Sequence, residues 1–91
     1  MAPWEVENLL LQHPALAEAA YVGVGDTHDK LIPTAFVVLK PGQNVTEKEL
    51  TAFCRKNLAD FKLPKKFEFI ESIPKTGSGK TNRHQLKQWP E

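Results

Sequence analysis

The strongest secondary-structure signal in the chain lies just past its midpoint. Thr46 and Glu49 match the S/T-x-x-E capping box that begins a helix. Beyond them, apolar side chains recur at helical spacing along one face: Leu50, Phe53, Leu58 and Phe61. Residues 34–39 before this helix and residues 65–70 after it have the composition of strands. A helix placed between two strands restricts the fold to one that mixes both kinds of element.

The remaining predicted elements are shorter. Residues 3–12 are expected to form a helix, because Pro3 suits a first-turn position and Glu5 favours the positive helix start. Residues 17–24 have the apolar composition of a buried strand, and residues 81–88 are expected to form a last short helix. We therefore predict an α+β fold. It has a small three-stranded sheet packed with helices, about three in number, and a mobile glycine-rich loop near the C-terminus.

The length of the chain allows one small domain, residues 1–91, with a single modest core. Cys54 is the only cysteine, so no internal disulfide can form and a reducing compartment is expected. No apolar run approaches the roughly 18 residues needed to cross a membrane. The N-terminus also lacks the pattern of a signal peptide. We therefore expect a cytoplasmic protein without a membrane span.

Charge is distributed unevenly along the chain. Residues 1–59 carry five basic and seven acidic side chains, whereas residues 60–91 carry seven basic and four acidic ones. A basic segment of this kind is either an ordinary solvated surface or a surface that meets an anion, such as a phosphate-bearing ligand. The charge alone does not decide between these two interpretations.

The segment "PKTGSGKT", residues 74–81, resembles the phosphate loop of nucleotide hydrolases at first sight. That loop needs a glycine where this chain has Pro74, which has no N–H group and a fixed φ. It also needs a long following helix, but only eleven residues follow Lys80. The phosphate-loop interpretation therefore fails, and Lys80 is either a solvated surface lysine or an ammonium group presented on a flexible loop.

Other candidates for chemistry are weak. His13, His28 and His84 have no spacing typical of a metal site, and with one cysteine a zinc cluster is not expected. Cys54 lies on the apolar face of the predicted central helix, where a core role is favoured over a nucleophilic one. The residues alone predict no metal site.

Five segments, taken in order, carry a resemblance to a known family: "PWEVE", "HPALAEAAYVGVG", "AFVVLKPG", "FKLPKKFEFI" and "PKTGSGK". Together they resemble the C-terminal domain of adenylate-forming, AMP-binding enzymes, which include acyl- and aryl-CoA synthetases, luciferases and peptide-synthetase adenylation domains. The similarity extends from Pro3 to Lys87. Within this superfamily the "PWEVE" start and the "LIPTAFVVL" segment look most like benzoate-type aryl-CoA ligases.

The resemblance implies that the chain is the small lid domain of an ATP-dependent acid:CoA ligase. Its partner would be a larger N-terminal adenylation domain, absent from this chain, that holds ATP, Mg²⁺ and a benzoate-like or fatty carboxylic acid. By the same resemblance Lys80 is catalytic and contacts carboxylate and phosphate oxygens while the acyl-adenylate forms. The loop that carries Lys80 consists of Thr76, Gly77, Ser78 and Gly79. The isolated chain is expected to be inactive.

The family uses a second face of this domain when CoA attacks the adenylate. The resemblance places Gly23, Val24 and Gly25 near the pantetheine tunnel of CoA. Three lysines are candidates for the CoA phosphates by charge alone: Lys62, Lys65 and Lys66.

Three alternatives remain open from the sequence. One is the C-terminal part of an amino-acid adenylation domain that loads a carrier protein. Another is a non-catalytic basic module that binds nucleic acid through residues 62–87. This is disfavoured, because the segment has no aromatic stacking ladder and only a small excess of charge. No nucleic-acid partner is therefore expected. The third is a structural or regulatory fragment that keeps the fold without the activity.

Overall fold

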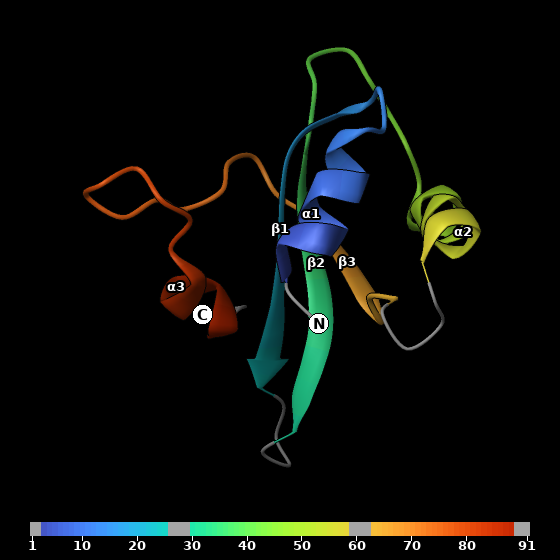
Figure 1. Ribbon diagram of the computed structural model, residues 1–91. Coiled ribbons are helices and arrows are strands. Elements are labelled where there is room, and N and C mark those ends of the chain that lie inside the picture. The colour runs from blue at the N-terminus through green and yellow to red at the C-terminus, as the bar shows by residue number, and fades with distance from the viewer. Residues whose placement is uncertain (1–2, 26–29, 59–62, 89–91) are drawn as a thin grey trace.

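The computed structural model describes residues 3–25, 30–58 and 63–88. The helices and strands of these ranges follow one another along the chain as shown in Figure 1: α1 (Pro3–Leu11), β1 (Leu16–Gly25), β2 (Leu31–Leu39), α2 (Glu47–Asn57), β3 (Lys66–Phe69) and α3 (Arg83–Lys87). The predicted α+β fold, with a small three-stranded sheet and three helices, is confirmed.

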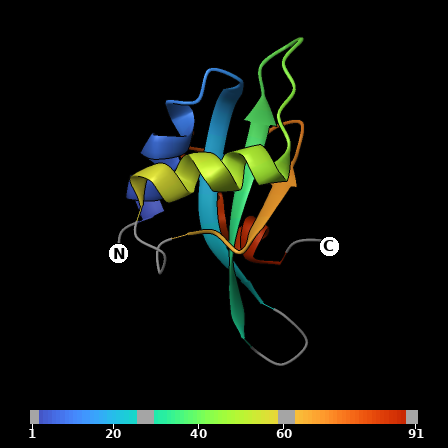
Figure 2. The same ribbon diagram turned by 90° about the vertical axis from the view of Figure 1, so that its right-hand side faces the viewer.

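The sheet is mixed, with the strand order β1-β2-β3. Strands β1 and β2 are antiparallel and pair from Leu16 with Leu39 to Gly25 with Leu31. Strands β2 and β3 are parallel and pair from Thr34 with Lys66 to Val37 with Phe69. A parallel pair needs a long crossover connection, and α2 provides it by crossing the face of the sheet (Figure 2).

The central strand β2 begins at Leu31, three residues earlier than predicted. Pro33 lies in this extension and cannot donate a ladder hydrogen bond. It is accommodated because the register between β2 and β3 starts only at Thr34. Pro33 contributes its carbonyl oxygen instead, which accepts a hydrogen bond from the Lys65 N–H at 2.8 Å.

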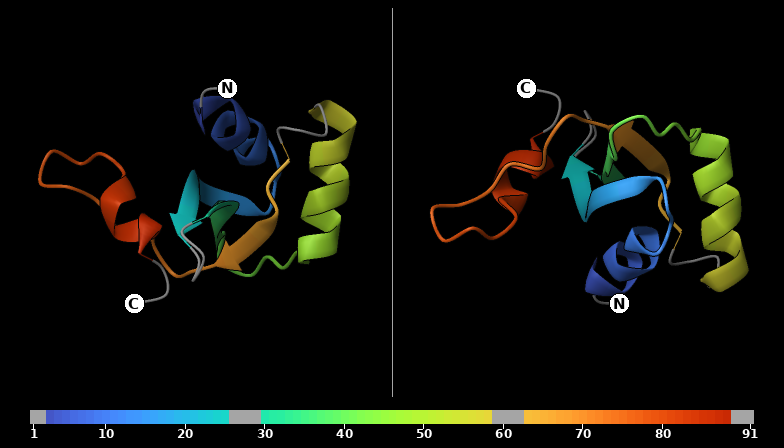
Figure 3. Two further views of the ribbon diagram at one scale, coloured as in Figure 1. Left: turned by 90° about the horizontal axis from the view of Figure 1, so that it is seen from below. Right: turned by 90° about the horizontal axis from the view of Figure 1, so that it is seen from above.

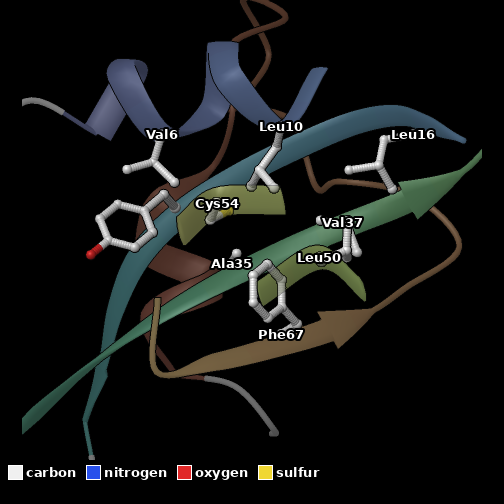
Figure 4. Packing of buried hydrophobic residues seen from close by; sticks show 9 residues of the cluster. Val6, Leu10, Leu16, Ala35, Val37, Leu50, Cys54 and Phe67 are labelled. Carbon is white, nitrogen blue, oxygen red and sulfur yellow. The ribbon is translucent and has the colours of Figure 1, made fainter. Parts of the chain in front are cut away.

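Helices cover both faces of the sheet, and each face has its own core (Figure 3). Alternate side chains of a strand point to opposite faces, so the run Ala35 to Val38 is buried on both sides. The first cluster, under α1 and α2, is shown in Figure 4 and comprises Val6, Leu10, Leu16, Tyr21, Ala35, Val37, Leu50, Cys54 and Phe67. The second, under α3, comprises Ala20, Val22, Phe36, Val38, Ile73 and Leu86.

The predicted capping box at the start of α2 is present. The Glu49 N–H donates to the Thr46 hydroxyl at 3.1 Å, and the Thr46 N–H donates to the Glu49 carboxylate at 3.2 Å. Leu50 and Cys54 are buried on the inner face of the helix, as the sequence predicted for both. Phe61, which the sequence assigned to the same face, lies outside the described residues. In the ranges that the structure covers, none of the helices has the length and apolar character needed to cross a membrane.

Candidate functional site

The glycine-rich segment forms a closed loop that projects away from the sheet (Figure 1). The two ends of this loop are joined where Lys75 and Thr81 pair in an isolated antiparallel bridge. We call residues 75–81 the lysine loop. Inside it the Thr76 N–H donates to the Lys80 carbonyl at 2.7 Å, and the Gly79 N–H donates to the Thr76 carbonyl at 2.9 Å. Gly79 has a φ of 86°, which only glycine adopts at little cost.

This geometry removes two of the N–H groups that a phosphate-binding loop would use. Such a loop needs several backbone N–H groups pointing at one anion, whereas the N–H groups of Thr76 and Gly79 are already used within the loop. Lys80 is exposed, and within the described part of the chain no carboxylate forms an ion pair with its ammonium group. What the loop offers a ligand is therefore the Lys80 side chain. The mobility expected from the sequence stays a prediction.

Both ends of the loop are fastened to the rest of the domain. Before the loop, Ile73 is buried in the second cluster, and the Lys75 ammonium contacts the Glu18 carboxylate of β1 at 2.9 Å. After the loop, Leu86 is buried in the same cluster. The Asn82 N–H also donates to the Pro74 carbonyl at 2.8 Å, which links the residue just after the lysine loop to the residue just before it. The position of Lys80 is therefore set by contacts on either side of the loop.

The strongest of these contacts involves Arg83, the first residue of α3. Its guanidinium donates to both oxygens of Glu7 in α1, at 2.7 and 2.9 Å. The same group donates to the Tyr21 carbonyl of β1 at 3.1 Å, and the Tyr21 N–H donates to Glu7 at 2.7 Å. The hydrogen bond that Arg83 donates to Glu7 raises the pKa of Arg83, although partial burial opposes this. One carboxylate thus joins α1, β1 and the start of α3, two residues after the lysine loop.

Sequence reasoning did not find this group. Glu7 was one of several acidic residues in the first helix, and Arg83 one of several basic residues in the last third of the chain. No local pattern links positions so far apart in sequence. The only signal available beforehand was the general tendency of arginine and carboxylate to pair.

The candidates for the CoA-facing surface gather at one end of the sheet. Gly23, Val24 and Gly25 end β1 and pair with the first three residues of β2. Lys65 and Lys66 are exposed at the start of β3, beside that part of β2. Lys62, the third candidate lysine, lies outside the described residues.

Two of these candidates have further geometric features. The Lys66 ammonium is 3.7 Å from the Glu68 carboxylate, so part of its charge is already balanced. Gly23 is confined, because a Cβ placed there would lie 3.1 Å from the Leu31 Cβ. Gly23 also borders a hollow of about 300 Å³ whose walls include both cations of α3; the lining residues are Tyr21, Val22, Gly23, Pro33, Arg83 and Lys87.

The structure therefore does not bring all predicted site residues together. The lysine loop begins at Lys75, which contacts Glu18 near the start of β1. Gly23, Val24 and Gly25 instead form the end of that strand. The two groups occupy different parts of the domain, and Arg83, two residues after the loop, lines the hollow beside Gly23. Among the described residues, no group of three His, Cys, Asp or Glu side chains is arranged to hold a metal ion.

Comparison with known proteins gives a consistent result. Residues 5–80 match the family described as AMP-binding enzyme C-terminal domain. A 2-succinylbenzoate–CoA ligase of Geobacillus sp. (strain WCH70) is 43% identical over 94% of this chain and 18% of its own length. The fatty acid–[acyl-carrier-protein] ligase ScoC of Streptomyces coeruleorubidus is 45% identical over 93% of this chain and 16% of its own length.

A solved structure matches equally well. The anthranilate CoA ligase AuaEII, in complex with anthranoyl-AMP, superposes with a TM-score of 0.83 at 39% identity, over 96% of this chain and 17% of that one. The chain thus spans less than a fifth of the length of each of these proteins.

Proposed function

Because the chain belongs to the AMP-binding enzyme C-terminal domain family, we propose that it serves as the swinging C-terminal domain of an AMP-forming acid:CoA ligase. The observation that carries the proposal is the placement of Lys80. Its exposed ammonium group stands on a closed loop that projects from the domain, at the last residue of the family match. A lysine held in this way can enter a site on another domain and leave it again.

The proposed chemistry of the first step follows from charge. A carboxylate of the acid attacks the α-phosphate of ATP, and pyrophosphate leaves as the acyl-adenylate forms. Two anionic groups must approach each other, and a positioned cation stabilises the transition state most where the negative charge develops. Lysine suits this role because its ammonium is a compact charge on a flexible stem. Lys80 binds and orients the oxygens, and it forms no covalent bond in this step.

The second step uses a different part of the domain. After adenylate formation the domain rotates, and the thiol of CoA attacks the acyl carbonyl to release AMP. We assign the sheet end with Gly23, Val24 and Gly25 to the pantetheine arm, and Lys65 and Lys66 to the CoA phosphates. The separation of this sheet end from the lysine loop supports a mechanism in which the two surfaces act in turn.

An aromatic carboxylic acid is the proposed substrate. Two of the compared proteins are named for aromatic acids, 2-succinylbenzoate and anthranilate, and one of them was solved with an aryl-adenylate, anthranoyl-AMP. A fatty acid is the second choice, because ScoC is named a fatty acid ligase. The acid, ATP and its Mg²⁺ are assigned to the N-terminal domain. Among the described residues no group of His, Cys, Asp or Glu side chains is arranged to hold a metal ion, so we assign this chain no role in binding Mg²⁺.

A carrier protein is the alternative acceptor. ScoC, at 45% identity, is named for transfer to an acyl carrier protein instead of CoA. The two functions differ only in the second step, so they separate when a full-length enzyme carrying this chain is given its acyl-adenylate with either CoA or a carrier protein whose pantetheine thiol is free.

The test of the proposed function uses that full-length enzyme with Lys80→Ala and two half-reactions. The first is adenylate formation from ATP and 2-succinylbenzoate or anthranilate, and the second is thioester formation from the supplied adenylate and CoA. We expect the first rate to fall by about 10²–10³-fold, the usual loss when one transition-state contact is removed, while the second stays near wild type. Lys48→Ala, at an exposed position in α2, is the matched control. An unchanged first rate in Lys80→Ala would refute the proposal.

A further inference from the structure

Glu7 has partners from two other elements, β1 and α3. One of its oxygens accepts from the Tyr21 N–H and from the Arg83 guanidinium, and the other accepts from the second nitrogen of the same guanidinium. Its side chain is only 13% exposed, and that of Arg83 is 37% exposed. Two-pronged arginine–carboxylate pairs fix the relative orientation of the groups that carry them. The Glu7–Arg83 pair thus resists rotation of α3 against α1 and β1.

Two other ion pairs of the described region differ from it in this respect. The Lys66 ammonium lies 3.7 Å from the Glu68 carboxylate, and the two side chains are 56% and 33% exposed. Both residues belong to β3, so their contact does not orient one element relative to another. Lys75 and Glu18 do join the loop to β1, but through a single ammonium contact. A lysine ammonium is a point charge, so this contact does not fix the orientation of the loop relative to β1.

Arg83 acts close to the reactive position. The Arg83 N–H donates to the Thr81 carbonyl at 3.1 Å, and Thr81 closes the lysine loop by its bridge to Lys75. A rotation of Arg83 therefore moves Thr81, which closes the lysine loop. Lys80 is the residue immediately before Thr81. The helix that begins at Arg83 has only five residues, which is too short to hold its direction without tertiary contacts.

We propose that the Glu7–Arg83 pair is a positioning device for Lys80, which aims the lysine loop at the adenylation site. Glu7 and Arg83 act as positioning residues, since neither is placed in contact with the reacting atoms. This inference rests on the proposed function of Lys80. A displacement of about 1 Å in a reacting group lowers a rate by as much as about 10²-fold, so a loosened pair affects the step that uses Lys80.

The experiment compares Arg83→Lys and Glu7→Gln in the full-length enzyme. Arg83→Lys keeps the charge but loses the two-pronged geometry, and Glu7→Gln keeps the shape but loses the charge. For both we expect kcat of adenylate formation to fall by about 10–10²-fold, with little change in KM for ATP or the acid. Thioester formation from supplied adenylate should stay near wild type when both half-reactions are assayed well below the melting temperature, which each change lowers because it weakens a largely buried ion pair. The double variant should be no slower than the slower single one, because the two residues act as one unit.

Glu68→Gln is the matched control, because it removes a carboxylate from a surface ion pair and should leave adenylate formation unchanged. A purely structural role would lower both half-reactions to a similar extent, and that result would overturn the inference. So would a wild-type adenylation rate in Arg83→Lys. These failures differ from failure of the proposed function, in which Lys80→Ala itself would leave adenylate formation intact.

Discussion

Lys75 and Thr81 face each other across an isolated antiparallel bridge, and the chain between them carries Lys80. The loop is thus held at its base as well as by hydrogen bonds inside it. Its shape depends on one residue with an unusual backbone conformation, Gly79, whose φ is 86°. Gly77, two residues earlier in the same loop, has no such conformation. The two glycines therefore provide a direct comparison.

Gly79→Ala is expected to destabilise the loop and Gly77→Ala is not. A Cβ meets no atom within 4 Å at either position, so the difference is one of backbone conformation alone. Alanine in a left-handed conformation costs about 1–2 kcal/mol. At an ordinary φ, the same substitution stabilises by up to about 1 kcal/mol through the unfolded chain. Denaturant unfolding of the two variants measures the difference, and equal free energies of unfolding would contradict the φ assigned to Gly79.

Leu86 packs α3 against the sheet. Truncation of its side chain is expected to loosen α3 and, with it, the C-terminal end of the lysine loop. The side chain is fully buried in the second cluster beside Phe36 and Ile73. Leu86→Ala should lower the free energy of unfolding by about 2–5 kcal/mol, the range for a buried leucine. Leu31→Ala is the control, because the same change is made at a side chain that is 68% exposed. Similar losses in both variants would show that α3 is not packed on the sheet as described.

The sequence predicted those elements whose cause is local. The capping box at Thr46, the apolar run of β2 and the turn-forming glycines near Lys80 each show within a few residues, and each is present in the structure. The start of β2 was placed too late. Pro33 argues against a central strand by its missing N–H, and only the register with β3 reveals that no donor is needed there.

The sequence could not predict contacts that depend on the assembled fold. Glu7 meets Arg83 only because α1 and α3 both pack beside β1, and Lys75 meets Glu18 for a similar reason. Many carboxylates and cations along the chain have the same local composition, so no pattern selects these pairs in advance. Lys80 was named as a candidate through the family resemblance of its segment, whereas the residues that hold the loop were not named in advance.

The buried thiol of Cys54 provides a pH-dependent test of the first cluster. Burial raises the pKa of Cys54 from 9.0 to about 11, because the thiolate loses its solvation there. A raised pKa means that the folded state favours the proton. The stability that comes from the neutral thiol is fully present below pH 9.0 and is lost as the pH rises through about 11. The free energy of unfolding should therefore decline over this interval.

Cys54→Ala separates this effect from the titration of other groups. The variant loses some packing at all pH values, but the difference between wild type and variant should be constant at neutral pH and shrink between pH 9.0 and about 11. Reaction with a thiol reagent gives an independent measurement. A fully buried, protonated thiol reacts only when the domain opens, so labelling of Cys54 at neutral pH should be slow. Its rate should rise with reagent concentration and level off at the opening rate of the first cluster once labelling is faster than reclosing. Rapid labelling in the folded protein would mean that Cys54 is not buried between α2 and the sheet.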